Sequence, residues 1–198
     1  MPSTEDTHAP PDPLAGWTLI TGSAGKAREV AEILGGELAH RPLDLPEVQA
    51  VRLEDVVGAK AEAAYARLGA PVIVEDTGLF FAAWNGLPGA LVKWFVDTVG
   101  VEGICRMLTP FDDRRAVART VVAAHDGRLR TYAGEVSGRI AGAPAGSGGF
   151  GWDPIFIPDG QARTFAEMAQ AEKLRFSMRR IAFEAMAADL GRPSPRVS

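Results

Sequence analysis

The sequence has 198 residues, of which 46% are hydrophobic, so it can bury a sizeable core in one domain or a compact two-lobed one. Its 21 Lys and Arg against 25 Asp and Glu give a formal net charge of -4, which leaves no net positive field to hold a nucleic-acid backbone. The single cysteine, Cys105, excludes an intramolecular disulfide and fits a reducing compartment, so we expect a cytoplasmic protein. No stretch is long and apolar enough for a membrane span, and no membrane partner is expected.

Both ends of the chain are predicted to be tails. Residues 1–15 contain four prolines and no apolar run, so they form a disordered tail and lack the apolar core of a signal peptide. Pro193 and Pro195 mark a frayed tail over residues 192–198. Residues 16–191 show no internal repeat or linker, which predicts a single domain.

The first half of the chain alternates strand and helix signals. A strand over residues 17–21 leads through a turn to a helix over residues 26–34, which Gly35 ends. Apolar residues at helical spacing predict a helix from Leu53 to Leu68, with Gly69 as its stop. A buried strand over residues 71–75 follows, and a loop is predicted at residues 76–78.

The second half adds an antiparallel hairpin and a helical end. Helical stretches are predicted over residues 92–99 and 103–108. The dipeptide Asp126-Gly127, between β-rich runs over residues 116–125 and 129–140, is a strong hairpin signal. A Gly-rich loop at residues 142–151 precedes a short strand at 155–157, and Thr164 and Glu167 have capping-box spacing. A final helix is predicted over residues 174–190.

The turn from Thr21 to Lys26 joins a strand to a helix N-terminus. Free backbone N–H groups and the helix dipole favour an anion there, and phosphate is the natural guest. Only two residues separate Gly22 from Gly25, so the spacing is not that of a Walker-type P-loop. Such a turn, taken alone, is more often only a turn.

Two lysines are ambiguous by themselves. Lys60 falls on the apolar face of the predicted helix, where a lysine needs a reason to lie. Either its aliphatic stem lies along the apolar face and its ammonium reaches water, or its ammonium binds an anion. Lys93 has the same two interpretations.

Carboxylates point to an oxygen-held metal. Glu75 and Asp76 stand at the end of the predicted buried strand, where open α/β sheets place ligands, and two adjacent acids suit metal binding or general-base catalysis. Glu47 could supply a further carboxylate. The three histidines are scattered and Cys105 has no partner, so zinc is disfavoured and Mg²⁺ carried in with phosphates is expected.

An aromatic segment follows the Gly-rich loop. Phe150 and Trp152 offer two ring faces, and Asp153 offers a carboxylate. Such a set could stack on a base and accept a hydrogen bond from it. Packing of the two rings in the core is an equally good interpretation of this segment alone.

Six segments, in order, resemble the inosine triphosphatase family, also called Ham1-like, whose members hydrolyse deaminated purine nucleoside triphosphates. The similarity runs from Thr21 to about residue 184 and is specific because the order is preserved. The segments are the turn at residues 21–26, Leu45-Pro46-Glu47, Val74-Glu75-Asp76-Thr77-Gly78-Leu79, residues 86–95, residues 149–154, and Thr164-Phe165-Ala166-Glu167-Met168 with Glu172-Lys173.

The resemblance implies a fold, a reaction and a site. The fold is α/β, a long mixed β-sheet flanked by helices in two lobes with a central cleft, usually paired as a homodimer. The reaction is Mg²⁺-dependent cleavage of a purine (deoxy)nucleoside triphosphate, such as ITP, XTP or dITP, to the monophosphate and pyrophosphate. Asp76 would orient the attacking water and bind Mg²⁺ with Glu47. The implied phosphate ligands are Thr21, Gly22, Ser23, Lys26, Lys60 and Lys93. The implied base and sugar contacts are Phe150, Gly151, Trp152, Asp153, Lys173, Met178 and Arg179.

Two positions depart from the family pattern. Ser23 stands where most members have Asn; it can still hydrogen-bond but reaches less far. Met178 stands in a Ser-Met-Arg segment where the pattern has Ser-His-Arg, so a strong donor toward the base is missing. Met178 also lies four residues from Leu174 and three from Ile181, a spacing at which it could join the core instead.

Three hypotheses follow from the sequence. The first is pyrophosphate release from a deaminated purine triphosphate as nucleotide-pool cleansing. The second keeps this chemistry but moves it to another standard or modified purine, and Met178 is the feature that favours it. The third is a nucleotide-binding protein without turnover, which the retained Glu47 and Asp76 oppose.

Overall fold

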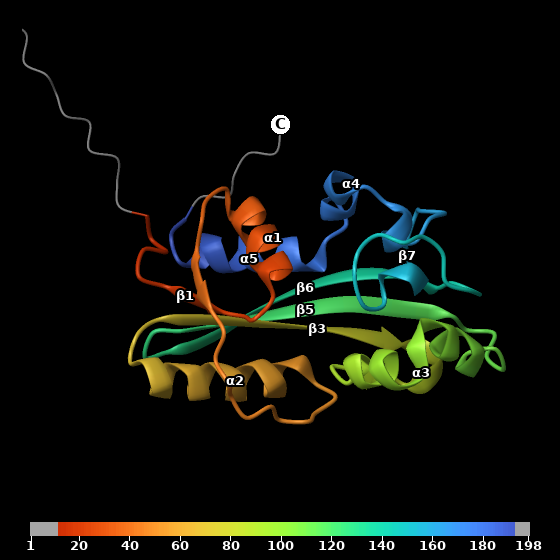
Figure 1. Ribbon diagram of the computed structural model, residues 1–198, viewed down its shortest axis with the longest axis horizontal. Helices are drawn as coiled ribbons and strands as arrows, with labels where there is room; N and C mark the ends of the chain where they lie inside the picture. The colour runs from red at the N-terminus through yellow and green to blue at the C-terminus, as the bar shows by residue number, and fades with distance from the viewer. Residues whose placement is uncertain (1–11, 193–198) are drawn as a thin grey trace, which may run out of the picture.

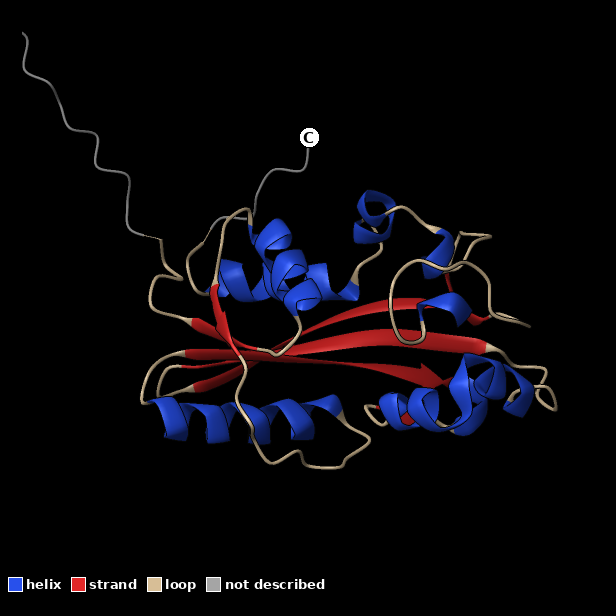
Figure 2. Ribbon diagram, viewed as in Figure 1, coloured by secondary structure: helices blue, strands red, loops and turns tan. Residues whose placement is uncertain are grey.

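A mixed β-sheet forms the middle layer of the computed structural model, which describes residues 12–192 (Figure 2). Its seven strands run in the order β2-β1-β3-β5-β6-β7, with β4 paired to β3. β1 pairs in parallel with β2 and β3, and the other pairs are antiparallel. The strands are β1 Thr18–Ile20, β2 Ala39–Arg41, β3 Val72–Phe81, β4 Pro88–Gly89, β5 Arg115–His125, β6 Leu129–Ile140 and β7 Phe156–Pro158.

Helices cover both faces of this sheet, as the α/β prediction requires. In the view of Figure 1, α1, α4 and α5 lie above the sheet and α2 and α3 lie below it. The helices are α1 Ala24–Leu34, α2 Leu53–Leu68, α3 Val92–Met107, α4 Gln170–Leu174 and α5 Met178–Asp189. Three short 3-10 turns complete the described chain: η1 Ala82–Trp84, η2 Asp153–Ile155 and η3 Phe165–Glu167.

Three hydrophobic clusters hold the layers together. The first joins α1 and α5 to one face of the sheet, and the second packs α2 against the other face. The third lies where α3, β7 and η3 meet the far ends of β3, β5 and β6. These clusters give each lobe its own core, and the shared sheet joins the lobes.

Local sequence signals set the ends of the first two helices. The Ser23 side chain accepts a hydrogen bond from the Lys26 backbone N–H and so caps α1, which begins two residues before its predicted start. Gly35 and Gly69 adopt left-handed conformations with φ of 66° and 63° and end α1 and α2. The hairpin at Asp126-Gly127 and the capping box of Thr164 and Glu167 are confirmed.

The loop predicted at residues 76–78 is wrong, because β3 continues to Phe81. Every residue from Val72 to Phe81 pairs with β5, so Asp76 lies within a strand and not after its end. Gly78 allows this continuation. A Cβ at Gly78 would lie 2.8 Å from the backbone carbonyl carbon of Gly89, so only glycine lets β4 approach β3 there.

The final helix predicted over residues 174–190 is confirmed as α5, but its start is wrong by four residues. α4 ends at Leu174, and α5 begins at Met178 after Ser177, whose side chain accepts a hydrogen bond from the Arg180 backbone N–H. Apolar spacing continues across this break, which is why periodicity alone did not detect it. The short strands β2 and β4 were not predicted either, because two or three residues show no measurable alternation.

The N-terminal tail is shorter than predicted. Leu14 is only 3% exposed and belongs to the cluster beneath α1 and α5. Arg192 closes the same region: its backbone N–H donates to the Ala187 carbonyl at 2.8 Å, and its guanidinium lies 3.4 Å from the Asp12 carboxylate. The remaining predicted tail residues, 1–11 and 193–198, lie outside the described range.

A substitution at Gly134 tests how tightly α5 packs on β6. A Cβ there would lie 2.0 Å from the Met178 carbonyl oxygen and 2.8 Å from the Ala182 nitrogen, so backbone must move. We expect Gly134→Ala to lower the free energy of unfolding by about 2 kcal/mol, the scale of overpacking in a rigid core. Urea denaturation measures it, with Gly142→Ala as the control, since nothing lies within 4 Å of a Cβ at Gly142. Equal stability of the two variants would contradict this packing.

Candidate active site

A gap in the strand pairing exposes one edge of β3. β1 pairs with β3 only at Val72 and Ile73, and β4 pairs with it only at Leu79 and Phe80. Within the described chain, no strand covers this edge between those pairs. Glu75 and Asp76 lie in the gap, and their side chains point to opposite faces because side chains alternate along a strand.

The turn at residues 21–26, called the phosphate turn after its predicted ligand, lies at the end of β1 beside this gap. The Ser23 backbone N–H donates to the Thr21 side-chain oxygen at 3.1 Å, which fixes the bend before α1. A cavity of about 170 Å³ is lined here by residues from the turn, from α2 and from β3. Its predicted site residues are Thr21, Gly22, Lys26, Glu47, Lys60 and Glu75.

Glu75 is the centre of a buried group of charges. Its carboxylate lies 2.6 Å from the Lys26 ammonium and 3.3 Å from Arg179 Nε. Arg179 also contacts Glu29, at 2.6 Å, and this group of two acids and two bases is neutral as a whole. Burial alone would raise the pKa of Glu75, but the charges of Arg179 and Lys26 outweigh burial and lower it to about 2.

Asp76 has the opposite titration behaviour. Burial raises the pKa of its carboxyl above the ordinary value, and the nearby Lys26 and Lys60 only partly oppose that effect. The Thr77 backbone N–H donates to Asp76 Oδ1 at 2.9 Å and holds the carboxylate in place. A half-buried, positioned carboxylate with a raised pKa is suited to accept a proton.

Glu47 and Asp76 line one small cavity of about 90 Å³. Glu47 is exposed, and its carboxylate lies 3.0 Å from the Lys60 ammonium. Two carboxylates with room for water and phosphate oxygens fit Mg²⁺, which usually takes few protein ligands. Among residues 12–192 no group of three or more His, Cys, Asp or Glu side chains is arranged to hold a metal ion, so a zinc-type cage is absent from this part of the chain.

Lys93 lines the same small cavity from α3 but is largely exposed. Its ammonium pairs with Asp97 one turn further along the helix, and the hydrogen bond and charge of Asp97 raise the Lys93 pKa. The structure therefore brings Lys93 to the site without a direct contact to Asp76 or Glu47.

Two of the predicted base-binding residues border a cavity of about 640 Å³ on the other side of the phosphate turn. Phe150 and Lys173 line it together with Ser23 and Lys26. Asp153 organises this side: its Oδ2 accepts from the Phe150 backbone N–H at 2.8 Å and from the Lys173 ammonium at 2.5 Å. The Lys173 ammonium lies 4.9 Å from the Phe150 ring centroid, and Phe150 is half exposed, so part of its ring surface remains open to the cavity.

Three of the other predicted base and sugar residues lie deeper. Trp152 is buried and packs edge-on against Phe156 with ring centroids 5.7 Å apart. Met178 is 4% exposed and belongs to the same hydrophobic cluster, so its side chain packs in the core. Arg179 is almost fully buried, but its Nη2 has no hydrogen-bond partner among the described residues. Gly151, at a φ of 59°, allows the turn between Phe150 and Trp152.

These three cavities adjoin one another through shared residues. Lys26 lines both the 640 Å³ and the 170 Å³ cavity, and Glu47 lines both the 170 Å³ and the 90 Å³ cavity. Sequence analysis did not identify Glu29 as part of the site. Its place on the buried face of α1, three residues after Lys26, was the only available signal.

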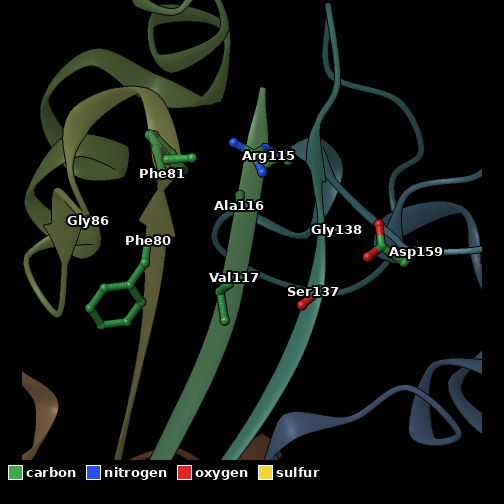
Figure 3. A pocket seen from close by; sticks show the side chains of 10 residues that line it. Phe80, Phe81, Gly86, Arg115, Ala116, Val117, Ser137, Gly138 and Asp159 are labelled. Atoms are coloured by element: carbon green, nitrogen blue, oxygen red, sulfur yellow. The ribbon is translucent and has the colours of Figure 1, made fainter. Parts of the chain in front are cut away.

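A separate cavity of about 460 Å³ lies at the far ends of β3, β5 and β6 (Figure 3). The cavity is lined from three neighbouring strands by Phe80, Val117 and Ser137, and Arg115 and Asp159 lie at its margin (Figure 3). The Arg115 guanidinium is already bound to Asp113 at 2.7 Å. None of the predicted site residues lines this cavity, so it is not the candidate active site.

Comparison with known proteins identifies the family to which this chain belongs. The profile of the Ham1 family matches residues 17–189. The chain belongs to the Ham1 family. It is 44% identical over 174 residues to a "dITP/XTP pyrophosphatase" of Methanopyrus kandleri, an alignment that covers 85% of this chain and 93% of the relative. It is 46% identical over 177 residues to "Inosine triphosphate pyrophosphatase 1" of Trypanosoma cruzi, covering 86% of this chain and 90% of the relative.

Solved structures of the family have the same fold. The Ham1 protein of Staphylococcus aureus superposes with a TM-score of 0.79 at 28% identity, covering 88% of this chain and 97% of that one. A "Nucleoside-triphosphatase / dITP/XTP pyrophosphatase" of Mycobacterium abscessus gives 0.69 at 29% identity, covering 88% and 98%. The predicted α/β fold and the family resemblance are therefore confirmed.

The raised pKa of Asp76 predicts that this residue reduces stability in the metal-free protein. Burial disfavours its charged form, so folding loses stability as the pH rises from the ordinary carboxyl value through the raised pKa. We expect Asp76→Asn to raise the melting temperature in EDTA at neutral pH, with a difference that shrinks toward the ordinary carboxyl value of 3.8. Thermal scans across pH measure this, with the exposed Asp159→Asn as control. A lower melting temperature for Asp76→Asn would contradict the burial argument.

Burial of Met178 predicts a cost for the residue that the family pattern has there. Met178→His would place an imidazole among apolar side chains, where burying a polar group without a partner costs about 1–3 kcal/mol. Met178→Leu conserves the volume and should cost less than about 1.5 kcal/mol. Urea denaturation of both variants measures these changes in the free energy of unfolding. A histidine variant as stable as the parent would show that this side chain can turn out of the core.

Proposed function

We propose that this chain hydrolyses a purine (deoxy)nucleoside triphosphate of the ITP, XTP and dITP class to the nucleoside monophosphate and pyrophosphate. The observation that supports the proposal most is the run of adjoining cavities from Phe150 to the open edge of β3. An aromatic face lies at one end, a cationic turn in the middle, and two carboxylates at the other end. The printed names of relatives that are 44% and 46% identical agree with this substrate class.

The three adjoining cavities together form a cleft, and the residues along it have different roles in the proposed reaction. Phe150 offers its ring face to the base, and Lys173 and the free Nη2 of Arg179 offer donors for a carbonyl oxygen on it. The turn at Thr21, Gly22 and Ser23 supplies backbone donors to the phosphates. Lys26, Lys60 and Lys93 add positive charge along the same path.

Asp76 carries the proton step. In this proposal its carboxylate accepts a proton as water attacks the α phosphorus, and the α–β anhydride bond breaks with its electron pair leaving on pyrophosphate. Glu47 and Asp76 would hold Mg²⁺, which, when bound, neutralises the charge that develops on the leaving group. The lysines of the cleft contribute to the same neutralisation without a proton transfer of their own.

The base preference is the part of the proposal with an alternative. Met178 lacks the donor of the family pattern, and its side chain packs in the core. The same chemistry on another purine triphosphate would follow if that donor were essential for discrimination. Lys173, Asp153 and Arg179 keep polar groups beside Phe150, and this arrangement favours the 6-oxo purine substrate.

Assembly and location add two further expectations. The family resemblance implies a homodimer, and the single cysteine favours a reducing, cytoplasmic compartment; both stay predictions. Of the helices in the described residues, none has the length and apolarity that a bilayer crossing requires.

The products test the reaction type. With ITP and Mg²⁺ we expect the monophosphate and pyrophosphate in equal amounts and no accumulation of orthophosphate, resolved by ion-exchange chromatography in the absence of added pyrophosphatase. A panel of ITP, XTP, dITP, ATP and GTP then ranks kcat/KM by base. Diphosphate plus orthophosphate as primary products would refute the cleavage site, and equal kcat/KM for ITP and ATP would support the alternative substrate class.

Variants of the two carboxylates test their roles. Asp76→Asn should lower kcat by a factor of about 10² or more, because the variant can neither accept the proton nor balance the metal charge. Glu47→Gln should mainly raise the Mg²⁺ concentration needed for half-maximal rate. Asp159→Asn, an exposed acid outside the cleft, is the matched control. Half of the parent rate retained by Asp76→Asn at saturating Mg²⁺ would exclude Asp76 as the catalytic base.

A further inference from the structure

The segment that carries Glu47 has little structure of its own. Residues 42–52 connect β2 to α2 without a helix or strand. Most of its side chains are exposed, and only Leu43, Leu45 and Ala50 are half-buried. A segment with so few buried contacts lies at the low end of local stability, so the position of Glu47 depends on individual contacts, of which its ion pair with Lys60 at 3.0 Å is one.

Both lobes hold this segment through hydrogen bonds. On the α2 side, Arg67 Nη1 donates to the Asp44 carbonyl at 2.6 Å. On the α3 side, the Ala90 backbone N–H donates to the Val51 carbonyl at 3.0 Å. Gly89 allows this second contact, because a Cβ there would lie 2.5 Å from the Val51 carbonyl oxygen. The segment is therefore anchored at both ends, and Glu47 lies between the anchors.

Trp94 makes a side-chain contact much closer to Glu47. Its indole Nε1–H donates to Gln49 Oε1 at 2.6 Å, two residues beyond Glu47. Trp94 is 57% exposed, so its ring is not a core residue. It lies on the first turn of α3, on the wall of the same small cavity as Glu47, Gln49 and Asp76.

We propose that the hydrogen bond between Trp94 and Gln49 is a latch that positions Glu47 opposite Asp76 for metal binding. This inference rests on the proposed function, since it concerns the same site, but it assigns two residues, Trp94 and Gln49, that are not among the predicted site residues. Asp76 is fixed within β3 by pairing to β5, whereas Glu47 lies on the irregular segment. The latch limits the positions that the Glu47 carboxylate samples, and a ligand that is held in place binds more tightly.

The latch predicts a change in metal affinity rather than in chemistry. Without it, Glu47 samples more positions and the site binds metal more weakly. Asp76 keeps its strand position and its hydrogen bond from Thr77, so the rate at saturating metal stays close to that of the parent. Since neither Trp94 nor Gln49 is buried, stability should change little.

A double-mutant cycle on the full chain tests the latch. Trp94→Phe removes the donor and keeps an aromatic ring, and Gln49→Met removes the acceptor at similar length. We measure Mn²⁺ binding by electron paramagnetic resonance without nucleotide, and the Mg²⁺ dependence of ITP cleavage. Each single variant should weaken metal binding roughly three- to tenfold, the range of one hydrogen bond, and the double variant should weaken it no further. Val99→Ala, an exposed apolar residue elsewhere on α3, is the matched control and should bind Mn²⁺ like the parent.

Two results would overturn the latch. One is Mn²⁺ binding by Trp94→Phe and Gln49→Met within twofold of the parent. The other is a fall in kcat at saturating Mg²⁺ with unchanged metal dependence, since that pattern belongs to a residue acting on the chemistry. Failure of the proposed function is distinguishable, because it is a parent that binds Mn²⁺ yet cleaves no triphosphate. In that case a weakened, non-additive Mn²⁺ affinity in the variants still supports the latch.

Discussion

The buried carboxylate of Glu75 is the constraint on which the rest of this structure depends. An isolated carboxylate in the middle of a sheet would be very costly, so it needs cations within hydrogen-bonding distance. Lys26 from α1 and Arg179 from α5 supply them, and Glu29 balances the second cation. One acid on β3 thereby fixes two helices on the upper face of the sheet (Figure 1). The same contacts hold Lys26 at the phosphate turn. Its ammonium pairs with Glu75 and also lines the cleft.

The neighbouring residue shows the other side of this arrangement. Alternation along β3 sends Asp76 to the opposite face, where burial is not offset by close ion pairs and its pKa is raised. Folding thus stabilises the charge of Glu75 and opposes that of Asp76. A group that the fold holds at a cost in its charged form is suited to take a proton or a metal ion, either of which relieves the cost. Among the described strands, none pairs with this edge of β3 at either residue, because β1 and β4 stop on either side of them.

The cleft combines rigid and loosely held parts. The phosphate turn, Asp76 and Asp153 are fixed by strand pairing, helix capping or short hydrogen bonds. Glu47 and Lys93 instead lie on exposed segments and pair with Lys60 and Asp97. Substrate and metal would replace these surface ion pairs, which contribute little to stability. In the proposed function, this division would let the two surface ion pairs give way to a highly charged ligand while Asp76 stays in place within β3.

The sequence by itself determined the family, the alternation of helices and strands and the hairpin, because capping residues, hydrophobic period and ordered motifs are local signals. It also predicted a set of site residues, most of which line the three adjoining cavities. Only the tertiary structure decided that Asp76 lies within a strand, since pairing with β5 is not encoded between residues 71 and 78. Tertiary packing also put Met178 in the core, where apolar spacing had left two interpretations open. It brought Glu29 to Arg179 across 150 positions of sequence, and Gln49 to Trp94 across 45. Such contacts depend on how the layers meet, and no local pattern records that.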